Sequence, residues 1–268
     1  MNRLSPRSRS LTLLAIAFVA LWLLPDIAAW LEYEPDEAWA RVRSSGVIRF
    51  ATDASYHPFE GVGSDGVFYG LDIDIAREIA RRIGARAEFV NAGMDALYDV
   101  LRVGQADASI SALPVDPARE GRWAYSRPYF DAGLVLVAPA HSEPQLKIGD
   151  LQGRTVVVAL GSDGDAWLRK RQREGAHVAA LRLDSNQEAL EAVIAGRADA
   201  AIVDGVAARQ HLSTRFADLR IVAQLTSEPY AIAVWGGSTE LLAAIDNALS
   251  DMQADGTLAR IVDTWMRK

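Results

Sequence analysis

Two stretches of the sequence repeat each other, one in each half of the chain. Residues 104–112 have the sequence GQADASISA and residues 196–204 have the sequence GRADAAIVD. Each follows an amphipathic segment, and the pattern predicts a helix that ends at the glycine and leads into a short buried strand. Two copies of this unit predict two similar α/β lobes, whose strands present their carboxyl ends to one shared cleft.

The rest of the chain supplies further helices and strands around the repeat. Hydrophobic periodicity predicts strands at 47–52, 86–90, 108–112, 134–138, 155–160 and 231–234. It predicts helices at 72–83, 95–103, 165–172, 185–195, 239–254 and 257–266. Residues 61–66 match G-x-G-x-x-G, but they lead into an extended segment and not a helix. We therefore expect a hairpin turn there, not a dinucleotide site.

The order of these elements predicts how the chain is divided between the lobes. We expect lobe 1 to comprise residues 41–138 with 228–268, and lobe 2 to comprise residues 139–227. The chain would then cross between the lobes near 137–144 and again near 226–230. Two such crossings form a hinge that allows the lobes to close around a ligand.

Composition excludes several classes of function. The formal net charge of the 268 residues is −7, which argues against a nucleic-acid partner. The chain has no cysteine, so disulfides, thiolate metal sites and thiol nucleophiles are ruled out. Its four histidines lack the spacing of metal ligands. We therefore expect neither a metal nor a cofactor.

The N-terminal segment differs in character from the rest. Arg3, Arg7 and Arg9 precede an uninterrupted apolar run from Leu11 to Leu24, which is the pattern of a secretory signal. We interpret residues 1–40 as a signal peptide or N-terminal membrane anchor followed by a spacer. Whether the segment is cleaved or tethers the protein is left open, but in both cases the protein is exported to the periplasm or another extracytoplasmic space.

Opposite charges follow the two repeated strands. The first strand breaks at Leu113-Pro114 and is followed by Arg119, and the second ends at Asp204. An arginine near the carboxyl end of a strand is well suited to bind an anionic ligand. The alternatives are that Arg119 is an ordinary surface residue and that Asp204 caps the helix that follows it.

The sequence resembles the bacterial solute-binding proteins of family 3, the periplasmic amino-acid receptors of ABC importers. The likeness covers residues 45–268 and consists of motifs in a specific order. They are Thr52-Asp53 with Tyr56 and Pro58-Phe59, Gly70 to Asp74, Asp107 to Arg119, Tyr125 to Tyr129, Asp150 to Gly153 with Gly161-Ser162, Gly196 to Ala200 with Asp204, and Asp255 to Trp265.

The resemblance implies a two-lobe α/β fold, the type II periplasmic-binding-protein fold with a two-strand hinge. It implies a monomeric receptor that binds a small polar ligand, most plausibly an amino acid, and delivers it to a permease in the inner membrane. Arg119 would bind the ligand carboxylate and Asp204 its ammonium. Tyr56 would stack on the ligand, Met94 would form a second wall, and Asp53 would face a basic side chain. The remaining ligand-binding residues would be Ala112, Leu113, Gly161, Ser162 and Asp163.

Three positions depart from the family pattern. Pro114 stands where a serine or threonine usually supplies a hydroxyl and a backbone N–H, Ala112 lacks a hydroxyl, and Asp163 replaces a common threonine. These departures leave open a different organic ion or a basic amino acid as the ligand.

Two other functions are considered. One is an enzyme on the same scaffold, such as a cyclohexadienyl dehydratase with Glu60 or Asp163 as the acid. The other is a sensory binding module held at the membrane by residues 11–31.

Overall fold

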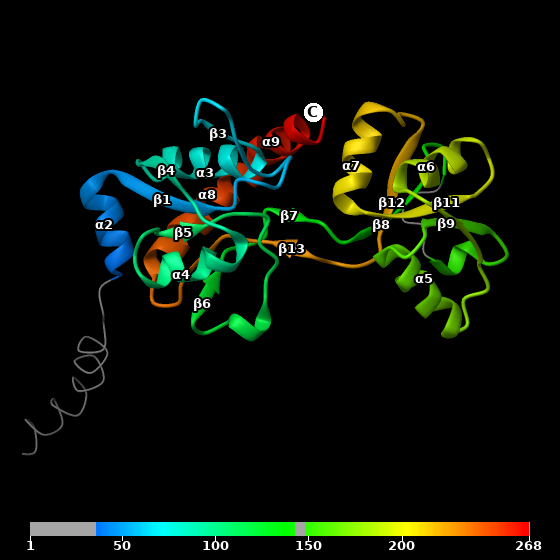
Figure 1. Ribbon diagram of the computed structural model, residues 1–268, viewed down its shortest axis with the longest axis horizontal. Helices are drawn as coiled ribbons and strands as arrows, with labels where there is room; N and C mark the ends of the chain where they lie inside the picture. The colour runs from blue at the N-terminus through cyan, green and yellow to red at the C-terminus, as the bar shows by residue number, and fades with distance from the viewer. Residues whose placement is uncertain (1–35, 143–147, 268) are drawn as a thin grey trace, which may run out of the picture.

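Two five-stranded sheets organise the molecule, one in each lobe (Figure 1). The computed structural model describes residues 36–142 and 148–267. Within them the lobes lie side by side and are joined by two extended segments. The two-lobe α/β architecture predicted from the repeat is confirmed.

The sheet of lobe 1 has the strand order β4-β1-β5-β14-β6. Its strands are β4 (Arg86–Asn91), β1 (Val47–Thr52), β5 (Ala108–Ser109), β14 (Ala233–Trp235) and β6 (Trp123–Tyr125). β1 runs parallel to β4 and β5, whereas β14 runs antiparallel to β5 and β6. The carboxyl ends of β1 and β5 therefore point to the same edge of the sheet.

Helices cover the faces of this sheet. They are α2 (Glu37–Ser45), α3 (Leu71–Arg82), the 3₁₀ turn η1 (Met94–Ala96), α4 (Leu97–Arg102), α8 (Thr239–Ala254) and α9 (Thr257–Met266). The periodic apolar face of α3, including Ile75 and Ile79, is fully buried in the lobe 1 core. The hairpin predicted at 61–66 is confirmed, because β2 (Gly61–Val62) pairs antiparallel with β3 (Phe68–Tyr69).

The sheet of lobe 2 has the order β10-β9-β11-β8-β12. Its strands are β10 (Ala179–Leu183), β9 (Thr155–Ala159), β11 (Ala200–Asp204), β8 (Leu134–Pro139) and β12 (Leu219–Gln224). Its helices are the 3₁₀ turn η3 (Ile148–Leu151), α5 (Asp163–Arg173), α6 (Asn186–Ile194) and α7 (Gly205–Thr214). The strands β8, β9 and β11 are apolar on both faces, and separate clusters pack on each side of the sheet.

The internal repeat has the same hydrogen bonds in both lobes. The Asp107 carboxylate accepts a bond of 2.8 Å from the Arg49 N–H, and its own N–H donates to the Arg49 carbonyl over 2.8 Å. Asp199 makes the matching pair of bonds with Thr155, at 2.9 and 2.8 Å. In each lobe, the aspartate of the repeated motif therefore joins two neighbouring parallel strands. Asp107, just before β5, is bonded to β1, and Asp199, just before β11, is bonded to β9.

The hinge is the antiparallel pair β7 (Phe130–Asp131) and β13 (Pro229–Tyr230). The Asp131 carboxylate accepts bonds from the N–H groups of Gly133 and Glu228, each at 2.9 Å, and from the Ser227 hydroxyl at 2.7 Å. Burial disfavours the charge of Asp131, but these hydrogen bonds outweigh it and lower the pKa. One carboxylate thus ties the two crossing segments together.

Three of the differences from the sequence prediction affect the division into lobes or the candidate site. The strand expected at 134–138 in lobe 1 is β8 of lobe 2, where it pairs with β11 and β12, so the first crossing lies at 131–134 and not at 137–144. Its uniformly apolar sequence suited a central strand of either sheet. The expected spacer up to residue 40 includes the start of α2, whose Val42 is buried. The strand expected at 108–112 ends at Ser109, and Ala112 has a φ of 43°.

The predicted signal or anchor at residues 1–31 lies outside the described residues. Across 36–142 and 148–267, each helix is too short or too polar to cross a bilayer. Nor does the described part of the chain bring together three or more His, Asp or Glu side chains in a way that could hold a metal ion.

Candidate functional site

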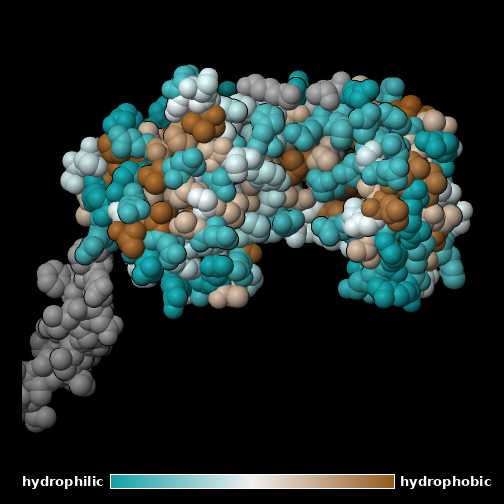
Figure 2. Space-filling view, viewed as in Figure 1, coloured by the Kyte–Doolittle hydropathy of each residue, from teal (hydrophilic) through white to brown (hydrophobic). Residues whose placement is uncertain are grey.

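The surface is hollowed between the lobes, on the side where β6 and α5 lie in Figure 1 (Figure 2). Segments from both lobes that follow the carboxyl ends of strands contain the predicted ligand-binding residues. Asp53 follows β1 and Gly161 follows β9 across the gap, while Asp204 ends β11. This is where open α/β sheets generally bind ligands.

Asp53 and Met94 are brought together on the lobe 1 wall. One carboxylate oxygen of Asp53 accepts a bond of 2.9 Å from the Met94 N–H, and the other accepts the Ser55 hydroxyl at 2.7 Å. The Asp53 N–H donates to the Ser111 hydroxyl oxygen over 2.9 Å. The Met94 residue is 41% exposed, so it is available as a wall.

Tyr56 presents an exposed aromatic face on the same lobe. Its ring stacks on Phe59 with centroids 5.4 Å apart, and the residue is 42% exposed. Burial, with a smaller effect of the charge on Asp204, raises the pKa of its hydroxyl. Tyr56 is thus fixed on one side, within electrostatic reach of the lobe 2 anion.

Arg119 ends the short 3₁₀ turn η2 (Pro117–Arg119). Its guanidinium pairs with Asp116 at 3.0 Å and lies over the Tyr98 ring, 4.5 Å from the centroid. The Tyr98 hydroxyl in turn bonds that of Tyr125 at 2.8 Å. Half of the Arg119 side chain stays exposed, so the guanidinium is positioned by an aromatic platform and retains donors for an anion.

Ala112, Leu113 and Pro114 are engaged by the protein itself. The Ala112 N–H donates to the Asp72 carboxylate at 2.6 Å, and the Leu113 carbonyl accepts the Ala231 N–H at 2.9 Å. Pro114 lies opposite Tyr230 in an antiparallel bridge, at a position where the flanking residues make the backbone bonds. An N–H at residue 114 would point away from that strand, which explains why a proline fits here.

The lobe 2 wall is built around the start of α5. Ser162 caps this helix by accepting the Asp165 N–H at 3.2 Å, and Asp163 is its exposed first residue. The Gly161 N–H donates to the Asp165 carboxylate at 3.1 Å, with Gly161 at a φ of 75°. Asp165, whose side chain is fully buried, also pairs with Arg169 and Arg182.

Asp204 caps α7, as the alternative interpretation proposed. It accepts the Ala207 N–H at 2.8 Å, and its second oxygen accepts the Asn186 amide at 2.9 Å. These two bonds orient both oxygens, and the half-buried carboxylate acts electrostatically on Tyr56 of lobe 1. Capping and ligand binding are compatible here, because a carboxylate oxygen accepts more than one hydrogen bond.

A model of the bacterial extracellular solute-binding proteins, family 3, matches residues 48–268. The chain belongs to this family. The arginine-binding protein 1 of an Escherichia coli ABC transporter is 28% identical over 224 residues, covering 81% of this chain and 90% of the relative. The lysine/arginine/ornithine-binding periplasmic protein of the same organism is 30% identical, covering 81% and 86%.

A solved structure shares the type II periplasmic-binding-protein fold with this family 3 protein. The L-cystine solute receptor of Neisseria gonorrhoeae, in its unliganded open conformation, matches with a TM-score of 0.72 at 25% identity, covering 85% of this chain and 96% of the receptor. The predicted family and fold class are therefore confirmed.

Several residues of this family 3 site were not predicted from the sequence. Asn186, which orients Asp204, belongs to a predicted capping box but carries no pattern of its own. Tyr98, which underlies Arg119, was assigned to a predicted helix without a role. Asp72, Ser111 and Tyr129 form a buried network with Glu60. Tyr129 stands in the recognised Tyr125–Tyr129 motif, the one signal that could have identified it.

Proposed function

We propose that this family 3 protein is an extracytoplasmic receptor that binds an amino acid between its lobes and delivers it to an ABC permease. The observation that carries the proposal is the pair of opposite charges at the gap. Arg119 is oriented by Tyr98 and Asp116 in lobe 1, and Asp204 is oriented by Asn186 and Ala207 in lobe 2. A zwitterion would satisfy both and draw the lobes together.

The acidic groups around the gap favour a ligand with a cationic side chain. Asp53 lies on lobe 1, and Asp163 and Asp204 lie on lobe 2. The two Escherichia coli relatives are named for arginine and for lysine, arginine and ornithine. We therefore infer that basic amino acids are the first class of ligand to test, with Asp53 facing the side-chain cation.

We further propose that the protein carries out no covalent chemistry. Glu60, one of the two carboxyls considered as a catalytic acid, is 1% exposed and accepts the Ser111 hydroxyl at 2.7 Å. It lies below the wall of the gap and out of reach of a substrate. Asp163, the other carboxyl, is exposed to solvent at the start of α5.

The proposal places the protein outside the cytoplasmic membrane as a monomer. Export by residues 1–40 and delivery to an inner-membrane permease are part of it. The alternative of a tethered sensory module has the same binding chemistry and differs only in the partner.

The test is isothermal titration with L-arginine, L-lysine, L-histidine and L-cystine. Arg119→Ala should weaken binding by about 30-fold or more, because lobe closure would bury its pair with the ligand carboxylate, and truncating one partner of a buried charge pair costs about 2–5 kcal/mol. Arg122→Ala removes the same charge from an exposed neighbouring position and is the matched control.

Asp204→Asn separates recognition from stability. Asparagine caps helices about as well as aspartate, and the Asn186 amide can turn its carbonyl toward the new NH₂, so the thermal midpoint should hold while affinity for the ammonium falls. Binding that survives both Arg119→Ala and Asp204→Asn would refute the zwitterion site. Dehydration of prephenate or arogenate by wild type that is lost in Asp163→Asn would refute the non-enzymatic assignment.

A further inference from the structure

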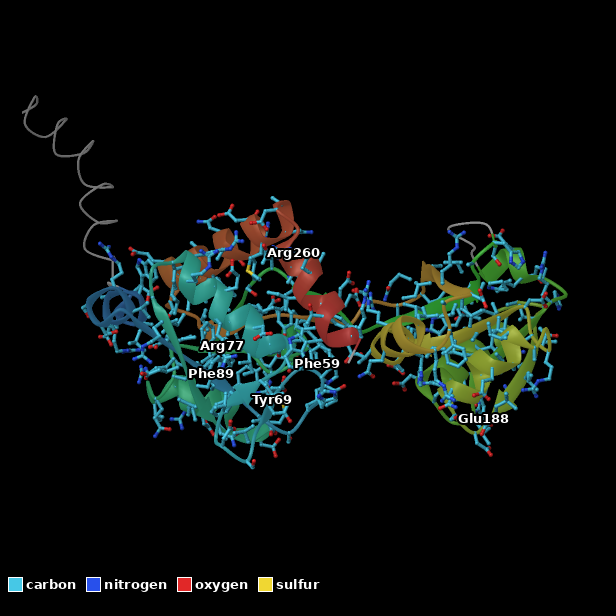
Figure 3. The ribbon with its side chains drawn as sticks, turned by 90° about the horizontal axis from the view of Figure 1, so that it is seen from above. Phe59, Tyr69, Arg77, Phe89, Glu188 and Arg260 are labelled. Atoms are coloured by element: carbon cyan, nitrogen blue, oxygen red, sulfur yellow. The ribbon has the colours of Figure 1, made fainter. Side chains whose placement is uncertain are left out.

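Two carboxyl groups, Glu60 and Asp72, are buried together beneath the lobe 1 wall. Glu60 is 1% exposed and Asp72 is fully buried. Glu60 ends the turn that begins at Tyr56, and Asp72 lies in the first turn of α3, where its N–H donates to the Phe59 carbonyl at 2.9 Å. Phe59 lies on the side of lobe 1 that faces lobe 2 (Figure 3). The pair is therefore directly behind the segments that border the gap.

The hydrogen bonds of this pair leave one oxygen of each carboxyl for the other. Glu60 Oε1 accepts the Ser111 hydroxyl at 2.7 Å. Asp72 Oδ2 accepts both the Ala112 N–H, at 2.6 Å, and the Tyr129 hydroxyl, at 2.8 Å. Glu60 Oε2 and Asp72 Oδ1 are buried and receive no donor from the described residues. Two carboxyls can share such a contact only if one of them carries a proton.

The surrounding donors decide which carboxyl carries it. Asp72 receives a backbone N–H and a hydroxyl, which stabilise a negative charge, whereas Glu60 receives a single hydroxyl. Burial, and then the charge on Asp72, raise the pKa of Glu60 to about 10. Burial raises the pKa of Asp72 to about 7. The other groups that act on the pair are also acids, namely Asp53, Tyr56, Tyr129 and Tyr230.

The hydrogen bonds continue from this pair to two of the predicted ligand-binding residues. The Asp53 N–H donates to the Ser111 hydroxyl, which donates to Glu60, and Glu60 acts directly on Asp72. Asp72 also holds the N–H of Ala112, whose φ of 43° lies in the left-handed region and needs such a contact to persist. Asp53 and Ala112 thus end the same chain of bonds.

We propose that Glu60 is a positioning residue that carries a proton at neutral pH, and that the Glu60–Asp72 pair sets the positions of Asp53 and Ala112 for ligand binding. This inference rests on the proposed function in one respect, namely that Asp53 and Ala112 border the ligand. Ionisation of Glu60 would place two charges side by side in the core and force the segments apart.

The two carboxyls are tested by replacing each with its amide. In Glu60→Gln the side-chain NH₂ can donate to Asp72 while the carbonyl accepts from Ser111, so the affinity for L-arginine at pH 7.5 should stay within about twofold. In Asp72→Asn the oxygen that accepts the Ala112 N–H and the Tyr129 hydroxyl is uncharged, and the negative charge moves to Glu60, which has one donor, so the affinity should fall about tenfold or more. The opposite order of the two variants would overturn the proposal.

Infrared spectroscopy tests the proton without any ligand and without relying on Asp72→Asn to fold. Wild type at pH 7.5 should show the carbonyl stretch of a buried protonated carboxylic acid, and Glu60→Gln should lack it. Amide NMR signals of Asp53 and Ala112 should move in Glu60→Ala and stay close to wild type in Glu60→Gln. A wild-type spectrum without the acid band would overturn the proposal, and so would unmoved amides in Glu60→Ala. If no amino acid binds wild type, the proposed function fails while these two readouts still decide the role of Glu60.

Discussion

The repeated aspartate offers a matched pair of substitutions, Asp107→Asn in lobe 1 and Asp199→Asn in lobe 2. Both aspartates accept the N–H of the equivalent first strand, and asparagine keeps that bond. Only Asp107 is fully buried, with ion pairs to Arg41 at 2.6 Å and to Arg49 at 2.8 Å. The Asp199 side chain is 41% exposed, and its pair with Arg154 is longer, at 3.5 Å. The comparison isolates the two buried ion pairs.

The size of the effect follows from this difference in burial. Removing one partner of a buried ion pair costs about 3–5 kcal/mol. The arginines beside Asp107 are 41% and 27% exposed, and solvent relieves them, so we expect about 3 kcal/mol. The exposed pair at Asp199 contributes at most about 1 kcal/mol. At about 2–4 °C per kcal/mol, Asp107→Asn should lower the thermal midpoint by about 6–12 °C, and Asp199→Asn by less than about 4 °C.

Differential scanning calorimetry at pH 7.5 measures both shifts, and a pH series checks their cause. Burial disfavours the charge of Asp107, but hydrogen bonds from Arg49 and Arg41 outweigh it and lower the pKa. A lowered folded-state pKa stabilises the protein above the unfolded pKa, and this stability is lost as the pH falls. The difference in thermal midpoint between wild type and Asp107→Asn should therefore become smaller below about pH 4. Equal shifts for the two variants, or a difference in thermal midpoint that does not depend on pH, would refute this account.

Two backbone positions give further predictions. Gly70 has a φ of 135°, and a Cβ there would lie 2.1 Å from the Phe59 carbonyl oxygen, whereas a Cβ on Gly66 (φ 78°) would meet no atom within 4 Å. Gly70→Ala should destabilise the protein by more than about 3 kcal/mol in urea unfolding, against about 1 kcal/mol for Gly66→Ala, and equal losses would contradict the steric argument. Ala112→Gly should remove strain at φ 43° and change stability by less than about 1 kcal/mol, with a large loss in the same assay as the contrary result.

Local patterns were sufficient to predict most of the elements. The helices predicted at 239–254 and 257–266 have those bounds in α8 and α9, because their apolar periodicity and the intervening Gly256 are local signals. The repeat predicted equivalent strands, since its motif is short and contiguous. The assignment of β8 to lobe 1 was wrong because an apolar strand suits a central position in either sheet. Only its pairing with β11 and β12 decides which sheet it joins.

The site was predictable only where single residues carry the chemistry. Arg119 and Asp204 are predicted as ligand-binding residues because a charge follows each repeated strand, and this role stays a prediction. The network of Glu60, Asp72 and Ser111 joins a turn, a helix start and a strand end. Such a network depends on tertiary distances, and a helix-start aspartate like Asp72 is ordinarily explained as favourable to the helix dipole.

Hydrogen bonds within lobe 1 determine which backbone N–H groups remain to bind the ligand carboxylate. The Ala112 N–H is taken by Asp72, Pro114 has no N–H, and the Val115 N–H is taken by the Pro229 carbonyl. The carboxylate must therefore depend on the Arg119 side chain more than on a rigid backbone cradle. Arg119 has one ion pair and one aromatic contact that orient its guanidinium, and half of the side chain is exposed. If these residues bind the ligand as proposed, we expect a fixed wall at Asp53 and Ala112 and a single side-chain cation for the carboxylate, which favours ligands distinguished at the ammonium and side-chain end.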